Sequence, residues 1–165
     1  MENDIISILE EDIKLFEDIK SQASYIATIA NEIIKAYKNK KKVVLFGNGG
    51  SAADAQHIST EFVGKFYKDR DSLPALALNT NTSSITATAN DFGYDRVFER
   101  QVSSLVNEGD IVIGISTSGN SPNVIKGLER AKEKKAMTIG FTGQKENKIE
   151  KITDYCLKIP SKDTP

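Results

Sequence analysis

The amino-terminal part of the chain carries a helical pattern of apolar side chains. Over residues 1–41, apolar residues recur three or four positions apart with charged residues between them, a spacing typical of amphipathic helices. The pattern predicts one long helix or two shorter ones. Such an arm must bury its apolar stripe, and both a partner subunit and the domain's own core are candidates for the cover. The stripe consists of Ile5, Ile6, Leu9, Ile13, Phe16, Ile26, Ile29, Ala30, Ile33, Ile34 and Tyr37.

From Lys42 onward, short apolar runs alternate with helical stretches. Strands without two-residue alternation, each followed by a helix, predict a parallel sheet that is covered on both faces. We therefore expect an α/β fold with a doubly wound five-stranded parallel sheet, flanked by helices and preceded by a helical arm at 1–41, with the α/β core at 42–165. The predicted strands are 43–46, 75–78, 111–115, 137–141 and 155–159. The predicted helices are 51–67, 83–89, 96–106, 122–134 and 146–152.

Composition narrows the class of protein. The chain has 165 residues, of which 39% are hydrophobic and 27% charged, which predicts one domain with a real core. A formal charge of −1 argues against nucleic-acid binding, because phosphate backbones normally require a basic face. The single cysteine excludes an internal disulfide. With an acidic beginning and no apolar run near the ~20 residues of a spanning helix, we expect a cytoplasmic protein with no membrane contact.

Two polar loops follow predicted strands, at the end of the sheet where parallel α/β folds bind ligands. The first, FGNGGS, is rich in glycines that permit close backbone approach. The second, GISTSGNSPNV, contains clustered hydroxyls just before a predicted helix start, which suits a phosphate group. Neither loop matches the P-loop or dinucleotide fingerprint. The pair predicts a small phosphorylated ligand, although a simple helix-capping turn is the alternative for the second loop.

The only histidine, His57, precedes Glu61 by four positions in a predicted helix. Residues at this spacing project from one face, so an imidazole and a carboxylate there can bind one metal ion or move one proton. A lone histidine is ordinarily a structural or surface residue, and Glu61 alone could be a solvated charge. The position of the pair behind a glycine loop favours the functional interpretation.

Three segments carry a resemblance to a known family: GNGGSAADAQH with Glu61 behind it, ANDFGYDRVFERQV, and GDIVIGISTSGNSPNVIKGLERAK. Together they resemble the sedoheptulose-7-phosphate isomerase (phosphoheptose isomerase) family of the sugar isomerase, or SIS, superfamily. The ISTSGNS loop is typical of any SIS domain, whereas the His57 and Glu61 pair with NDFGY is more specific. The likeness extends from the first helix to Pro165 and implies a single flavodoxin-like SIS domain.

The resemblance also implies an activity. Family members convert sedoheptulose 7-phosphate to D-glycero-D-manno-heptose 7-phosphate, the first step toward the ADP- or GDP-heptose of bacterial lipopolysaccharide or capsule. They are homotetramers that bind zinc. Glu61 would be the acid/base that moves a proton through an enediolate, and His57 and Glu61 would be zinc ligands. The substrate would be bound by Asn48, Gly49, Gly50, Ser51, Glu61, Lys65, Asn90, Asp91, Ser116, Thr117, Ser118 and Ser121.

The sequence departs from the family pattern at its end. Family members continue into a C-terminal helix whose glutamine and histidine complete the zinc site and supply a second acid/base, whereas this chain ends at IPSKDTP. Zinc normally takes three or four protein ligands. We therefore expect one zinc per subunit, with its remaining ligands from a C-terminal helix that is not in this chain. A smaller departure is Lys65, where relatives commonly have arginine.

Two other functions use the same fold. One is a non-catalytic SIS module that binds a protein such as the bacterial replication initiator, and the other is a sugar-phosphate sensor. The resemblance implies that the initiator-binding proteins lack a carboxylate at the position of Glu61. Sensors normally carry a DNA-binding helical domain in front, which the acidic beginning of this chain does not resemble. Asp91 could also be a turn residue rather than a ligand contact.

Overall fold

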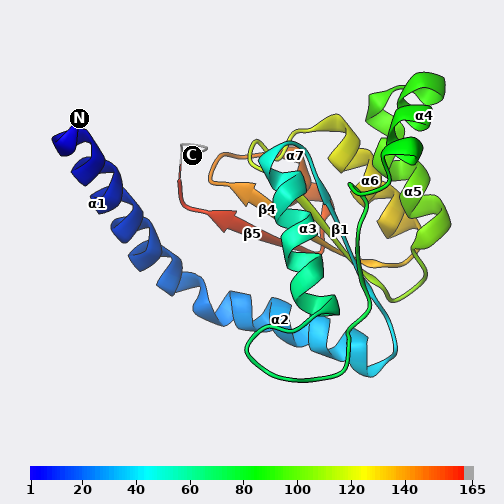
Figure 1. The fold of residues 1–165 in the computed structure, drawn as a ribbon, viewed down its shortest axis with the longest axis horizontal. Helices are drawn as coiled ribbons and strands as arrows, with labels where there is room; N and C mark the ends of the chain where they lie inside the picture. The colour runs from blue at the N-terminus through cyan, green and yellow to red at the C-terminus, as the bar shows by residue number, and fades with distance from the viewer. Residues whose placement is uncertain (162–165) are drawn as a thin grey trace.

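A five-stranded, all-parallel sheet forms the centre of the computed structural model, which describes residues 1–161 (Figure 1). The strand order is β2-β1-β3-β4-β5. This is the doubly wound, flavodoxin-like order, so the predicted fold class is confirmed. Each strand lies within two residues of its predicted position. The strands are β1 (Val43–Gly47), β2 (Ala75–Ala77), β3 (Ile111–Ser116), β4 (Met137–Gly143) and β5 (Tyr155–Ile159).

Helices cover both faces of the sheet, and each face has its own apolar core. Successive residues of β1 point to opposite sides, as strand geometry requires: Val44 and Phe46 lie in one core, and Val43 and Leu45 in the other. The first core lies under α4 (Thr82–Phe92), α5 (Val97–Leu105), α6 (Pro122–Glu133) and α7 (Lys148–Ile152), with the short 3-10 helix η2 (Tyr94–Arg96) between α4 and α5. The second core lies under α2 (Ala23–Lys38) and α3 (Gly50–Val63).

The amino-terminal region forms two helices rather than one. α1 (Glu2–Ile19) and α2 are joined by the 3-10 turn η1 (Lys20–Gln22). α2 buries Ile29 and Ala36 against the sheet. Its start is also held to the edge strand β5, because the Tyr25 hydroxyl accepts a hydrogen bond of 2.9 Å from the backbone N–H of Cys156. This contact satisfies a donor on an edge strand that would otherwise face solvent.

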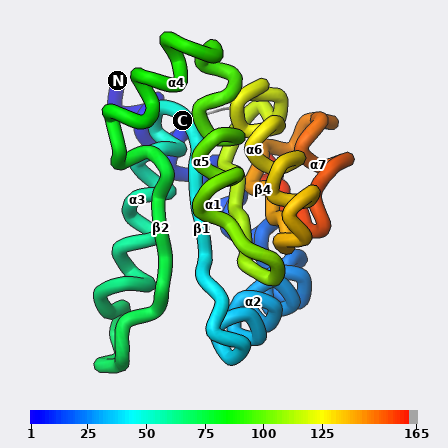
Figure 2. The backbone as a smooth tube through the Cα atoms, turned by 90° about the vertical axis from the view of Figure 1, so that its right-hand side faces the viewer, coloured from blue at the N-terminus to red at the C-terminus, as the bar shows by residue number. Residues whose placement is uncertain are grey.

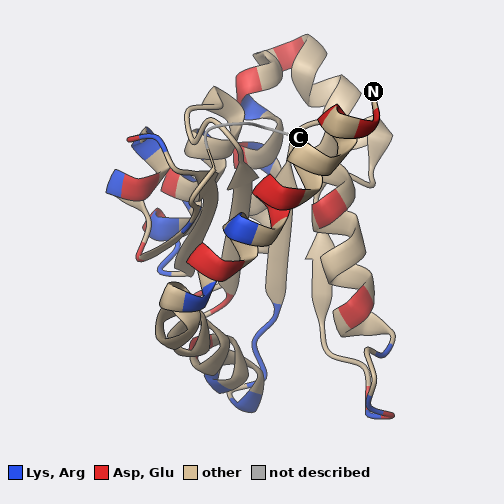
Figure 3. Ribbon diagram, turned by 90° about the vertical axis from the view of Figure 1, so that its left-hand side faces the viewer, with Lys and Arg blue, Asp and Glu red and all other residues tan. Residues whose placement is uncertain are grey.

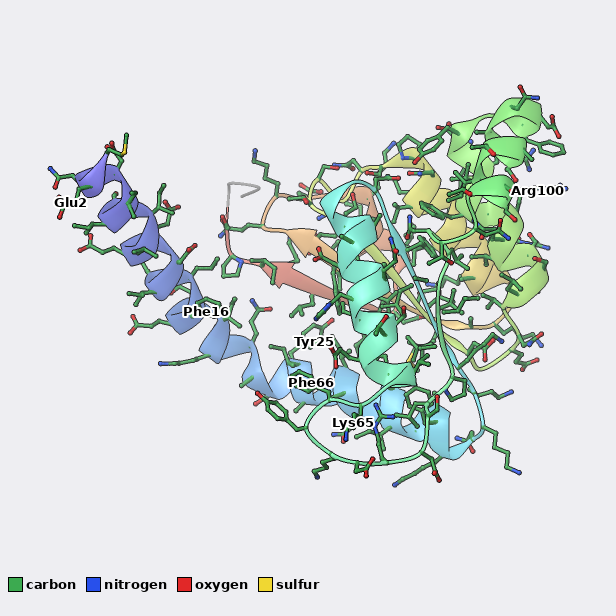
Figure 4. The ribbon with its side chains drawn as sticks, viewed as in Figure 1. Glu2, Phe16, Tyr25, Lys65, Phe66 and Arg100 are labelled. Carbon is green, nitrogen blue, oxygen red and sulfur yellow. The ribbon has the colours of Figure 1, made fainter. Side chains whose placement is uncertain are left out.

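α1 extends away from the domain (Figure 1) and has no buried residue. Its apolar stripe is uncovered in a single chain: Ile13 is 63% exposed and Phe16 is 70% exposed. Figure 4 shows Phe16 on this projecting helix. Acidic residues outnumber basic ones along α1, as the red bands in Figure 3 show. Within residues 1–161, no helix is long and apolar enough to cross a membrane.

The predicted end of the helix at 51–67 is wrong, because α3 ends at Val63. Gly64 leaves the helical conformation with ψ near −122°, while its N–H still bonds the carbonyl of Thr60. The next carbonyls accept hydrogen bonds from the guanidinium group of Arg70. In a longer helix, backbone N–H groups of the next turn would donate to these carbonyls. The guanidinium group of Arg70 takes their place.

Tyr37 generates a prediction about stability. Its ring packs on Phe62 of α3 at a centroid distance of 5.6 Å, joining α2 to α3. Its hydroxyl is the buried side-chain polar atom without a hydrogen-bond partner in the described part of the chain. Burial raises the pKa of Tyr37 from 10.0 to about 12, although the nearby Arg70 charge lowers it. The folded protein therefore keeps this proton at a pH where the unfolded chain has lost it.

We expect Tyr37→Phe to leave the free energy of unfolding at pH 7 unchanged or raise it by up to about 1 kcal/mol, because an unpaired hydroxyl is removed. As the pH rises from 10 to 12, the wild type should lose stability relative to the variant, because the unfolded state binds fewer protons than the folded state. Urea unfolding across this range measures both effects. Parallel stability curves for the two proteins would contradict the assignment.

Candidate functional site

The site lies at the carboxyl ends of β1 and β3, which are neighbours in the sheet. α3 follows β1 on one face, and α6 follows β3 on the other face. Figure 2 shows α3 and α6 on opposite sides of β1. The two loops therefore leave the sheet in opposite directions, which opens a crevice where doubly wound proteins bind ligands.

Glycines shape the first loop. A Cβ on Gly47 would lie 2.7 Å from Cβ of Ser51 and 2.8 Å from the carbonyl oxygen of Ile115, so only glycine lets α3 begin this close to the sheet. Gly49 adopts a left-handed φ of +56°, which favours glycine. A Cβ on Gly49 or Gly50 would meet nothing within 4 Å. This side of the loop is open, so a ligand can reach the backbone at the start of α3.

The second loop carries a cluster of hydroxyl groups. Ser116 Oγ lies 3.0 Å from Ser121 Oγ and 3.5 Å from Ser118 Oγ. Ser121 is the N-cap of α6, but among the described residues its side chain makes no capping bond to that helix. The capping-turn alternative therefore does not account for Ser121. The hydroxyls open into a cavity of about 270 Å³, which we call the hydroxyl cavity, lined by Asn48, Ser51, Ile115, Ser116, Thr117, Ser118 and Ser121.

Residues at the start of α7 hold the second loop in place. We call this loop, residues 116–121, the hydroxyl loop. Gly119 has a φ of +61°, and a Cβ there would lie only 2.2 Å from Cγ of Asn147. The carbonyl of Gly119 accepts a hydrogen bond of 3.1 Å from the N–H of Ile149. The N–H of Lys148 donates to the Oδ1 atom of Asn120 at 3.1 Å. The loop is thus fixed before a ligand arrives, which lowers the entropy cost of binding.

An asparagine pair joins the two loops. The side-chain amides of Asn48 and Asn123 donate to each other's oxygens, each at 2.9 Å, across 75 residues of sequence. The Tyr94 hydroxyl donates to the same Asn48 oxygen at 3.2 Å. Asn123 is 3% exposed. The side chain of Asn48 therefore braces the loops, and the sequence analysis missed Asn123 and Tyr94 as its partners.

His57 and Glu61 lie together on α3, as their spacing predicts. His57 Nε2 is 3.7 Å from Glu61 Oε1, and the two side chains are 77% and 34% exposed. His57 lines a second cavity of about 370 Å³ that shares Ser51, Ile115 and Thr117 with the hydroxyl cavity. Within residues 1–161 no group of three or more His, Cys, Asp or Glu side chains could hold a metal ion. The pair therefore offers two ligands of a metal site.

Not every residue that the resemblance assigns to the substrate lines a cavity: Gly49, Gly50 and Glu61 line neither of the two. Three further residues lie elsewhere in a single chain. Lys65 follows the end of α3 that points away from the glycine loop (Figure 4), and its Nζ is 4.0 Å from Asp69 Oδ1. Asn90 and Asp91 are exposed on α4, where the Asn90 amide donates to Asp91 Oδ1 at 2.9 Å. None of the three lines the two cavities. Because Asp91 lies within a helix, the turn interpretation of this residue is wrong.

Comparisons with known proteins agree with this geometry. Residues 9–143 match the SIS domain family. A phosphoheptose isomerase of Aneurinibacillus thermoaerophilus is 54% identical over 140 residues, which is 85% of this chain and 71% of that protein. A phosphoheptose isomerase of Clostridium acetobutylicum is 48% identical over 168 residues, covering 100% and 86%. The structure of a phosphoheptose isomerase from Neisseria gonorrhoeae superposes with a TM-score of 0.92 at 36% identity, covering 99% of this chain and 88% of that one.

Gly119 provides a test of the fixed hydroxyl loop. Gly119→Ala places a methyl group against Asn147 at a left-handed φ, so we expect a loss of about 1–2 kcal/mol in stability from the backbone alone and weaker binding of inorganic phosphate. Gly109→Ala is the matched control, because Gly109 also has a positive φ, of +82°, but its Cβ meets only the flexible side chain of Lys41. Urea unfolding and phosphate titration by calorimetry compare the two. Equal phosphate affinities would contradict the account.

Proposed function

Because this chain belongs to the phosphoheptose isomerase family of SIS-domain proteins, it is a sugar-phosphate isomerase of heptose biosynthesis, and we propose that it converts sedoheptulose 7-phosphate to D-glycero-D-manno-heptose 7-phosphate. One structural observation carries the choice of ligand. The hydroxyl cavity opens beside the cavity that His57 lines, and the two share Ser51, Ile115 and Thr117. A ligand with a phosphate at one end and a reactive polar end at the other fits this pair.

The phosphate would be bound by the hydroxyl groups of Ser116, Thr117, Ser118 and Ser121, at the positive end of the α6 dipole. The sugar would lie along α3 from the glycine loop toward His57. Ser51, Asp54, His57 and Ile58 of this helix all line the second cavity. Glu61 lies one turn beyond His57, about 15 Å along the helix axis from Ser51.

Glu61 would act as the acid/base. Its carboxylate takes a proton from C1 of the ketose, and the C–H electron pair forms the C1–C2 double bond of an enediolate whose negative charge lies on O2. The proton then returns to C2 while the proton of the O1 hydroxyl passes to O2, so that O1 becomes the aldehyde oxygen and O2 becomes a hydroxyl group. C1 is oxidised and C2 is reduced by the same amount, so no external redox partner is needed. A positioned carboxylate typically contributes about 10²–10⁴-fold to such a proton transfer.

We further propose that His57 and Glu61 hold one zinc ion per subunit, with the remaining ligands supplied from outside residues 1–161. An imidazole and a carboxylate fit the zinc donor set, and a complete site needs three or four such groups. When bound, zinc would polarise the substrate oxygens and orient the sugar. The uncovered apolar stripe of α1 supports assembly with other subunits, and we propose a homotetramer. The product would supply the ADP- or GDP-heptose of lipopolysaccharide or capsule.

Glu61→Gln tests the assigned chemistry. Glutamine preserves the shape of the side chain but cannot accept the proton, so we expect kcat to fall by about 10²–10⁴-fold while binding of inorganic phosphate stays unchanged. Glu129→Gln, which changes an exposed carboxylate on α6, is the matched control and should retain full activity. Aldose formation from sedoheptulose 7-phosphate is followed with and without a chelator. Normal turnover by Glu61→Gln, or no turnover by the wild type, would contradict the proposal.

A further inference from the structure

Arg70 connects the loop after α3 to the end of that helix. Its Nη2 atom donates to the backbone carbonyl of Glu61 at 2.8 Å. Its Nη1 atom donates to the carbonyls of Phe62 and Asp71, both at 2.9 Å. The bonds to Glu61 and Phe62 are partly buried, which shields them from solvent. One guanidinium group therefore ties the last turn of α3 to the returning chain.

The last carbonyls of a helix have no partner within the helix. In α3, the carbonyl of Thr60 is satisfied by the N–H of Gly64, and that of Phe62 receives the N–H of Leu73 in addition to Arg70. The carbonyl of Glu61 is bonded by Arg70. A cation is also favourable at this negative end of the helix dipole. The main chain at the proposed acid/base thus depends on Arg70.

The exposed part of the loop, residues 65–69, contributes little to this constraint. Lys65, Phe66 and Tyr67 are exposed, and the ion pair between Lys65 and Asp69 is long at 4.0 Å. Exposed pairs of this kind contribute about 0–1 kcal/mol. The Phe62 ring also packs against Tyr37 of α2. The end of α3 is therefore held by a ring contact and by the Arg70 guanidinium.

We propose that Arg70 is a positioning residue for the isomerisation, because it fixes the last turn of α3 and thereby aims the Glu61 carboxylate at the reacting carbons. The proposal rests on the proposed function, in which Glu61 is the acid/base. Arg70 itself touches neither of the two cavities. Its effect passes through the backbone of Glu61, and arginine is required because its planar fork reaches several carbonyls at once, whereas a lysine ammonium group on a flexible stem does not hold that geometry.

Kinetics separate positioning from substrate binding. A displacement of about 1 Å at a reacting group can cost about 10²-fold in rate. We expect Arg70→Gln and Arg70→Lys each to lower kcat by about 10–100-fold, with KM changed by less than about twofold because the hydroxyl cavity lies at the other end of α3. Arg130→Gln is the matched control: Arg130 is also a partly buried arginine, bonded to Ser103 and Glu133 away from α3, and its loss should leave both constants unchanged.

Chemical rescue adds a readout that a general loss of stability would not produce. In Arg70→Ala, added guanidinium ion should occupy the vacated position and restore kcat in a saturable manner, whereas methylammonium should not. Restoration by neither ion, or by both equally, would overturn the role assigned to the guanidinium fork.

The single histidine gives a readout that does not depend on turnover. His57 produces one imidazole Cε1–H resonance, and its ring lies 3.7 Å from the Glu61 carboxylate. In chelator-treated protein at fixed pH, this resonance should shift in Arg70→Gln and stay in place in Arg130→Gln. An unmoved resonance together with an unchanged kcat would overturn the positioning role of Arg70 and leave the proposed function standing. If the wild type does not isomerise the sugar, the proposed function fails, and an unmoved resonance would then refute the positioning inference separately.

Discussion

The site depends on the adjacency of β1 and β3 in a parallel sheet whose next helices lie on opposite faces. At this point the strand order reverses across the sheet, so the loops after β1 and β3 diverge and leave a crevice. The glycine loop and the hydroxyl loop are brought together by this topology, although nearly 70 residues separate them in sequence. The neighbouring strands β3 and β4 lack this arrangement, because α6 and α7, which follow them, lie on the same face.

The crevice is held in shape by contacts within the chain itself. The reciprocal amide pair of Asn48 and Asn123 sets the distance between the loops. Asn147 and the start of α7 hold the hydroxyl loop in its left-handed turn at Gly119. At the far end of α3, Arg70 holds the backbone of Glu61. In the proposed function, phosphate binding and proton transfer lie toward two ends of one helix, which would let the phosphate position the sugar without taking part in the proton transfer.

The sequence predicted the parts of the structure that depend on local pattern. Continuous apolar runs identified the five strands, and turn residues identified both loops. The spacing of His57 and Glu61 placed them on one helix face. The errors and omissions come from contacts between residues far apart or outside a helix. Asn123 looks like any polar residue at a helix start until its partner 75 residues away is known, and the early end of α3 depends on a guanidinium from the following loop. The roles of Lys65, Asn90 and Asp91 came from the family resemblance, and a single chain does not bring them to the cavities.

Solvent isotope incorporation tests the central claim most directly. With sedoheptulose 7-phosphate in D2O, proton NMR of the product reports whether the hydrogen delivered to C2 has exchanged with solvent, as is expected of a proton held by the Glu61 carboxylate, which is 34% exposed. Transfer through an enediolate predicts deuterium at C2 of the aldose and, on prolonged incubation, at C1 of the recovered ketose. Formation of the aldose with no deuterium at C2 would indicate a direct hydride shift and would contradict the account.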